Sequence, residues 1–123
     1  MTWQFSNDRP IYVQLVEQIQ RKILSGEYAP GQKLPGVREM AVQAAVNPNT
    51  LQRALLELEQ KELVYTQRTV GRFISADEEK IAALRREYAK GAASEFLGQM
   101  QSLGYSTGEV SALISETIEE ENV

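Results

Sequence analysis

The sequence contains neither cysteine nor histidine among its 123 residues. Without cysteine it can form no disulfide framework and no thiolate zinc site. Without histidine it lacks the usual general base and the commonest metal ligand. A catalytic site would have to rely on serine, lysine and scattered acids, which fall at helix caps and on polar faces. We therefore expect no enzymatic activity, no metal and no cofactor.

Long apolar runs are absent as well. No stretch of about 18 apolar residues could cross a membrane, and the N-terminus lacks the basic-then-apolar pattern of a secretion signal. We expect a cytoplasmic protein with no membrane partner. A chain of 123 residues suffices for one small domain and an appendage, and it buries roughly two-thirds of its unfolded surface.

The charge is unevenly distributed along the chain, whose net charge is −4. Residues 1–75 contain nine Lys/Arg against seven Asp/Glu, a balance of +2, whereas residues 76–123 contain four against ten, a balance of −6. A mildly basic first part with an acidic tail is compatible with nucleic-acid binding through one face. Because +2 is a small excess, we expect modest non-specific affinity and a real dependence on the specific site.

Residues 34–59 predict two short helices that meet at a tight turn. Apolar residues recur with helical spacing in both halves, so each helix has one apolar stripe and one polar face. The stripes consist of Val37, Met40 and Ala41, and of Leu51, Ala54, Leu55 and Leu58. Asn47 can cap the second helix, and Pro48 fits its first position because the N–H that proline lacks would be unpaired there anyway. The pattern is that of a helix-turn-helix.

The second helix begins with polar side chains on its outward side: Asn49, Thr50, Gln52 and Arg53. Amide, hydroxyl and guanidinium groups read base edges and phosphates in a major groove. A solvated helix face that begins with an ordinary cap is the alternative. Arg38, in the first turn of the first helix, favours DNA binding, because a purely structural turn would prefer an acid against the helix dipole.

Residues 8–75 also resemble a known family. The motifs are Pro10-Ile11-Tyr12-x-Gln14-Leu15, Gly26-x-x-x-Pro30-Gly31-x-x-Leu34-Pro35-x-Val37-Arg38-Glu39-Met40-Ala41, Val46-Asn47-Pro48-Asn49-Thr50-Leu51-x-Arg53-Ala54-Leu55-x-x-Leu58-Glu59 and Gly71-x-Phe73-Ile74. They are similar to the DNA-binding domain of the GntR family of bacterial winged-helix transcription regulators. The resemblance implies DNA contacts at Arg38, at residues 47–52 and at the wing tip, with Gln52 where an arginine is common.

Three departures from the family pattern are visible. Gly36 and Ala45 replace the usual serine and glycine, and we expect both to be tolerated. The turn at residues 67–71 has only one of the two glycines usual at the wing tip.

This turn separates two predicted strands, at residues 63–66 and 72–75, which are rich in β-branched and aromatic residues. Arg68 and Arg72 flank the tip and Thr69 occupies it, so these side chains could reach a phosphate or a minor groove. An exposed hairpin with solubilising charges is the alternative interpretation.

The N-terminal part predicts a helix that begins at Pro10 and ends at Gly26. Before it, Trp3 and Phe5 could cover the core or lie in a subunit contact, and we favour the core. After it, residues 32–34 predict a short extended piece that can join a small sheet.

Two further helices follow the predicted wing. The first starts after Ser75, a candidate cap, and keeps an apolar period of three to four for about six turns, and the second opens with a capping box at Ser106 and Glu109. A hairpin of two amphipathic helices cannot bury both stripes by itself, so a partner is implied. The expected dimerisation residues are Leu84, Tyr88, Phe96, Met100, Leu113 and Ile114.

A second copy of the chain is the economical partner. One winged helix reads only a half-site, whereas a twofold dimer spans two half-sites roughly 34 Å apart. The tail is similar to that of the YtrA-like branch of the family, whose short all-helical C-terminal part dimerises. The alternative is a hairpin that folds back on its own winged helix. Two helices leave little room to enclose a metabolite. A pocket for an unknown effector at the dimer interface is the alternative that the sequence retains.

The sequence thus predicts a mostly α protein with a small β-wing. It comprises a winged helix-turn-helix DNA-binding domain at residues 1–75 and a helical dimerisation tail at residues 76–123. We expect a sequence-specific transcriptional repressor that binds a palindromic operator in double-stranded DNA as a homodimer. The predicted DNA-binding residues are Arg38, Asn47, Asn49, Thr50, Gln52, Arg53, Arg68 and Thr69. The alternative function is a winged-helix protein–protein adaptor without DNA specificity.

Overall fold

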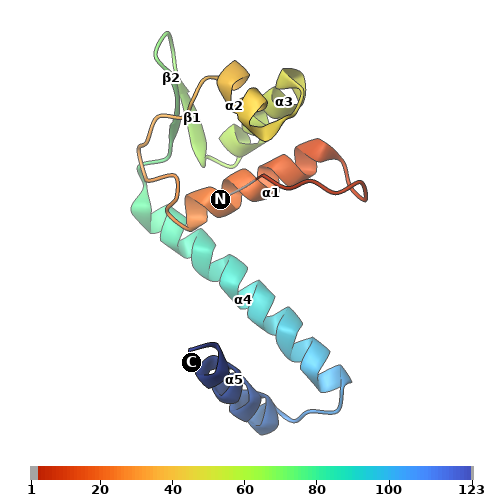
Figure 1. Cartoon of the computed structure of the whole chain (residues 1–123). Coiled ribbons are helices and arrows are strands. Elements are labelled where there is room, and N and C mark those ends of the chain that lie inside the picture. Colours follow the sequence, from red (N-terminus) through yellow and green to blue (C-terminus); the bar gives the residue numbers. More distant parts are fainter. Residues whose placement is uncertain (1–2, 123) are drawn as a thin grey trace. The chain divides into compact units, whose positions relative to one another are not determined.

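The computed structural model describes residues 3–122 and contains the predicted elements in the predicted order. These are α1 (Ile11–Leu24), α2 (Val37–Ala44), α3 (Pro48–Gln60), β1 (Val64–Gln67), β2 (Gly71–Ile74), α4 (Glu78–Ser102) and α5 (Thr107–Glu121) (Figure 1). The mostly α fold with a small β-wing is therefore confirmed. The chain forms two compact units, Met1–Arg85 and Arg86–Val123, and each is described by itself.

The core of the first unit lies where α1 and α2 pack on α3 and the wing closes one end. Leu15 and Ile19 of α1, Met40 of α2 and Leu51 of α3 are fully enclosed. The stripes predicted for α2 and α3 are buried, except that Val37 is only half-buried. Their helical spacing therefore marks the faces that pack together.

The boundaries of α1 follow from local chain chemistry. Pro10 stands at the N-cap position with extended backbone angles, so α1 begins at Ile11, one residue later than expected. Gly26 follows the end of α1 with a φ of 85°. This left-handed conformation suits glycine, because glycine has no Cβ to clash with the backbone.

The segment before α1 lies along that helix because two glutamine side chains bind its backbone. Gln14 Oε1 accepts a hydrogen bond from the Ser6 N–H at 2.8 Å, and Gln14 Nε2 donates to the Ser6 carbonyl at 2.9 Å. Gln18 makes the same pair of contacts with Gln4, at 3.2 and 2.5 Å. From this segment Trp3 and Phe5 pack on the core, which confirms the interpretation favoured for them.

The wing is an antiparallel pair in which Val64 faces Ile74 and Tyr65 faces Phe73. A third short segment joins its edge, as predicted for residues 32–34. Lys33 forms a bridge with Phe73, and the Ile74 N–H donates to the carbonyl of Gln32 at 2.8 Å. The wing is thereby fixed to the chain that leads into α2.

The start of α4 differs from the expectation that Ser75 would cap it. Asp77 is the residue before the helix, and its Oδ1 accepts a hydrogen bond from the Lys80 N–H at 3.1 Å. Ser75 Oγ instead accepts from the Asp77 N–H at 3.2 Å. The cap therefore lies two residues later than predicted, because the Ser75 N–H still pairs with the Leu63 carbonyl at 2.9 Å and the chain has not yet left the wing.

The second unit contains most of α4 and all of α5, which starts at the predicted capping box. Ser106 Oγ accepts from the Glu109 N–H at 3.2 Å, and a Glu109 carboxylate oxygen accepts from the Ser106 N–H at 2.9 Å. The backbones of the two helices come close to each other at few positions. Within the described residues, Val110 is the one buried side chain of α5. No helix between residues 3 and 122 is both long and apolar enough to span a bilayer.

Candidate nucleic-acid interface

The turn between α2 and α3 gives α3 a sharp start. Ala45 ends α2 with a φ of 56° and a ψ of 46°, in the left-handed region. Asn47 then caps α3, because its Oδ1 accepts a hydrogen bond from the Asn49 N–H at 2.8 Å, and Pro48 follows as the first helical residue. The helix-turn-helix and its cap are as predicted. The cap uses one oxygen lone pair of Asn47 and leaves its NH₂ group for other partners.

The first turns of α3 present the predicted readers to solvent. Asn49, Gln52 and Arg53 are exposed and Thr50 is half-buried, while Leu51 on the opposite face is fully buried. The first turn of α3 contains no acid. The positive end of the helix dipole therefore adds to the charge of Arg53, and the surface favours anions.

Arg38 is exposed on the first turn of α2, which packs against α3. Gly36 precedes α2 at the N-cap position and supplies no side-chain hydrogen bond to the helix. The first backbone N–H groups of α2 are therefore not capped by the residue before the helix, and they add positive potential beside Arg38. Glu39 in the same turn offsets part of that potential.

At the wing tip Arg68 and Thr69 are both exposed. Thr69 has a φ of 64°, and its Oγ1 donates a hydrogen bond to the Arg68 carbonyl at 2.6 Å. A β-branched residue rarely occupies this left-handed region, so the tip holds local strain of a kind that often marks functional sites.

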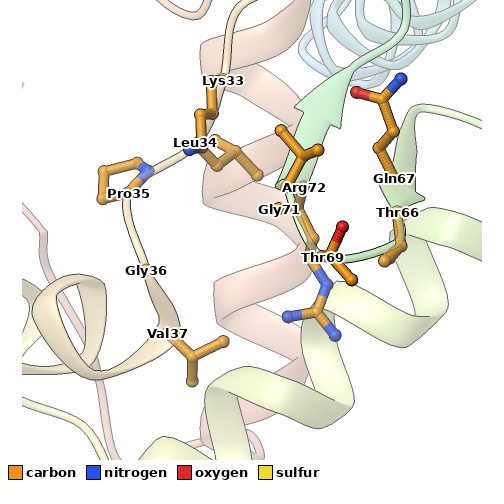
Figure 2. A pocket seen from close by; sticks show the side chains of 11 residues that line it. Lys33, Leu34, Pro35, Gly36, Val37, Thr66, Gln67, Thr69, Gly71 and Arg72 are labelled. Atoms are coloured by element: carbon orange, nitrogen blue, oxygen red, sulfur yellow. The ribbon is translucent and has the colours of Figure 1, made fainter.

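Arg72, which the sequence placed beside the tip, is bound to the recognition helix. Its Nε donates to Glu59 Oε1 of α3 at 3.0 Å, and the two side chains are only 17% and 24% exposed. Thr66 Oγ1 of β1 donates to the same carboxylate oxygen. Figure 2 shows the Arg72 guanidinium group extending from β2 towards the neighbouring helix. Glu59 therefore ties the wing to α3, a role that the sequence analysis did not assign.

A hollow separates the wing from the start of α2 (Figure 2). It is lined on one side by residues 33–37 and on the other by Thr66 and the wing turn. Gly71 has a φ of 142°, and a Cβ added there would lie 3.0 Å from Lys33 Cε. The backbone angle thus favours glycine at this position, whereas the flexible end of Lys33 could move aside for a Cβ.

Arg53 has a neighbour that the sequence analysis missed. Its guanidinium carbon lies 3.6 Å from the centroid of the Tyr12 ring, which belongs to the first turn of α1. The two residues meet because α1 packs on α3. Each stands in a motif quoted above, but no local spacing relates one motif to the other.

The charged groups of this surface are suited to binding. Among residues 3–122 no group of acids could hold a metal ion. Shifted carboxylates lie elsewhere: a hydrogen bond from Lys80 lowers the pKa of Glu62, and one from Lys22 lowers the pKa of Glu27. The α2–α3 face carries hydrogen-bond donors and the cations Arg38 and Arg53, with Glu39 as an exposed acid beside Arg38.

The six residues expected at a dimer interface divide into three groups. Tyr88, Phe96 and Ile114 are exposed by 52%, 40% and 40%. Met100 and Leu113 are half-buried. Leu84 lies against the core of the first unit, so part of its side chain is already covered. The assignment of all six to dimerisation stays a prediction.

Comparison with known proteins gives a consistent result. The sequence model of a family described as bacterial regulatory proteins, gntR family, matches residues 11–74. The uncharacterized HTH-type transcriptional regulator YhcF of Bacillus subtilis (strain 168) is 40% identical over 107 residues, which cover 87% of this chain and 88% of that protein. The HTH-type transcriptional repressor YtrA of the same organism is 44% identical over 66 residues, or 54% of this chain and 51% of that protein.

Two solved structures are also similar. A GntR family transcriptional regulator from Listeria monocytogenes has a TM-score of 0.85 and 38% identity, with 91% of this chain and 98% of that chain covered. The DNA-binding domain of AraR in complex with operator ORX1 has a TM-score of 0.55 and 27% identity, with 61% of this chain and 99% of that chain covered.

Proposed function

This chain belongs to the GntR family of bacterial regulatory proteins and is a transcriptional regulator with a DNA-binding domain; from this premise we propose that it represses transcription as a homodimer on a palindromic operator. The start of α3 enters the major groove of each half-site, and the wing lies beside it. The observation that carries the proposal is the exposed polar face formed by the first turns of α3, beside the uncapped start of α2.

Roles within this face divide by chemistry. Asn49 and Gln52 contact base edges through their amides, and Thr50 contacts a phosphate. Arg38 and Arg53 grip phosphate or guanine. Residues 47–53 enter the groove together, and Arg68 with Thr69 lies in the groove beside the wing. Support for DNA as the partner comes from the related AraR domain, which is described in complex with an operator.

The tail supports the homodimer. Three large apolar side chains of the tail are exposed to solvent: Tyr88, Phe96 and Ile114. Exposed apolar side chains that gather on one face often mark a protein–protein interface. A second copy of the chain would cover them and would also supply the second DNA-reading helix. Sedimentation equilibrium at micromolar concentration should therefore give the mass of a dimer. A monomer under these conditions would contradict the homodimer.

The sequence specificity is tested by selection of bound duplexes from a random library at near-physiological salt, because low salt would inflate attraction to phosphate. We expect enrichment of a palindrome whose half-sites lie about one helical turn apart. A library with no enriched sequence would favour the protein–protein adaptor instead.

Gln52→Ala sharpens this test, with Gln60→Ala as a matched control at the end of the same helix. The first change should weaken operator binding by about 1–3 kcal/mol and relax the preference at one base pair in each half-site. The control should bind like the unmodified protein, because Gln60 lies away from the first turns of α3.

A further inference from the structure

Tyr12 of α1 carries the Arg53 guanidinium group on the face of its ring. The separation of 3.6 Å between Arg53 Cζ and the ring centroid is that of direct stacking, well inside the range of about 6 Å over which a ring attracts a cation. We infer that Tyr12 is a positioning residue that holds Arg53 ready for a phosphate of duplex DNA. The inference rests on the proposed function, since it concerns how that DNA is gripped.

Stacking leaves Arg53 both charged and accessible. A guanidinium group makes its hydrogen bonds at its edge, through five N–H donors, whereas the ring contacts its flat face. Arg53 remains an exposed residue in spite of the stack. A phosphate can therefore bind the edge without first displacing the tyrosine.

The alternative partner for Arg53 would be Glu57, one turn further along α3. A salt bridge between them would have a spacing of four residues, although with the base before the acid, which is the weaker order. It would compensate the charge and occupy donors that DNA needs. None of the ion pairs among residues 3–122 involves Arg53. The Arg53 guanidinium group is thus stacked on the ring of Tyr12 and not paired with a carboxylate, so its donors stay available to a phosphate.

Position along the helix supports the same role. Side chains on an α-helix lean towards its N-terminus, so Arg53 leans towards the turn that carries Asn49 and Gln52. An unrestrained arginine loses rotamer freedom when it binds, and the stack has already restricted these rotamers. Arg38 offers an internal comparison, because within the described residues no ring is stacked on it.

The test is a double-mutant cycle read by fluorescence anisotropy on the selected operator, or on a generic duplex at low salt if no operator is found. Y12F keeps the ring and should bind within about twofold of the unmodified protein, whereas Y12L should bind about threefold to tenfold more weakly. In an R53A background Y12L should cause no further loss. In an R38A background it should cause its full loss, because that arginine is not on the ring.

A second readout needs no DNA. The ring current of Tyr12 should shift the Arg53 side-chain resonances upfield in the unmodified protein and in Y12F, and this shift should vanish in Y12L. If Y12L fails to fold, as judged by thermal unfolding, Y12Q replaces it as the ringless variant. Resonances of Arg53 at their random-coil positions in the unmodified protein would overturn the inference.

The binding outcomes separate this inference from the proposed function. Equal losses for Y12F and Y12L would overturn it, since the tyrosine hydroxyl would then contact DNA itself. A loss for Y12L that persists in the R53A background would also overturn it. Both results leave the DNA-binding function standing, whereas failure of the unmodified protein to bind any duplex would overturn the function and the inference together.

Discussion

The two units of this chain use the same helical spacing of apolar residues to different ends. In the first unit the stripes meet each other, and side chains such as Ile19 and Leu58 are wholly enclosed. In the second unit the backbones of α4 and α5 come close at few positions, and residues such as Phe96 and Ile118 remain exposed by 40% and 53%. A periodic apolar pattern therefore marks a helix face that is suited to packing, but it does not say what packs on that face.

Charge differs between the two units as well. Residues 1–85 contain eleven Lys/Arg against ten Asp/Glu, a balance of +1, whereas residues 86–123 contain two against seven, a balance of −5. The second unit is therefore the less favourable partner for a polyanion such as DNA.

The largest expected effect follows from the enclosed core of the first unit. Leu58→Ala should lower the free energy of unfolding by about 2–5 kcal/mol, because a fully buried leucine leaves a cavity when it is truncated. Leu56→Ala, on the same helix but at a residue 47% exposed, should change it by no more than about 0.5 kcal/mol. Chemical denaturation measures both, and equal losses would mean that α3 does not form the core as described.

The exposed face of the tail predicts the next effect. Ile114→Glu should weaken self-association about a hundredfold or more, because it places an unpaired charge on the face where we propose that a second copy packs. The first unit should remain folded, as its own core is untouched. Sedimentation velocity over a concentration series measures the change. Ser115→Glu adds the same charge at an adjacent exposed residue, and an equal effect there would assign the loss to charge alone.

A smaller effect should come from the turn before α3. Ala45→Gly should raise the free energy of unfolding by about 0.5–1 kcal/mol, because glycine removes the strain of a Cβ in the left-handed region, partly offset by its freer unfolded chain. Ala44→Gly, at the buried last residue of α2, should lower it by a similar amount. Thermal unfolding of both variants checks the opposite signs, and two losses would place Ala45 outside the strained region.

The smallest effect concerns pH and the capping box of α5. Hydrogen bonds from the Ser106 backbone N–H and then from its side chain lower the pKa of Glu109 below its ordinary value. A carboxylate with a lowered pKa stabilises the fold above its unfolded pKa, and this contribution disappears as the pH falls through the lower, folded value. An NMR titration of the Ser106 amide should follow that loss. Glu109→Gln should flatten the titration, whereas Glu116→Gln should leave it unchanged.

Local signals made much of this molecule predictable from sequence. The cap at Asn47, the proline after it and the capping box at Ser106 each depend on residues within four positions of one another. The wing was predictable because two β-rich runs flank a polar turn. The candidate site residues on α3 follow from the same periodicity, since the exposed polar face lies opposite the buried one.

Contacts between distant segments were not predictable in this way. Tyr12 meets Arg53, and Glu59 meets Arg72, only because packed elements bring them together. Leu84 fits the apolar period of α4 equally well whether it packs on the first unit or on a partner. Only the structure shows that it lies against the core of the first unit. Each missed role depends on which helix lies against which face, and a single sequence does not encode that as a local pattern.

The glutamine contacts along α1 have a geometric consequence. Gln14 and Gln18 are one repeat of four residues apart, a rise of about 6 Å along the helix, and they bind the backbones of Ser6 and Gln4, two residues apart in an extended chain at about 6.6 Å. The repeat of the helix and the repeat of the extended chain differ by about a tenth. Glutamines on a helix can therefore pair with an extended segment as a strand edge does over two such repeats, but not over many. Two glutamines spaced by four residues on α1 can thus bind alternate residues of an extended segment beside it.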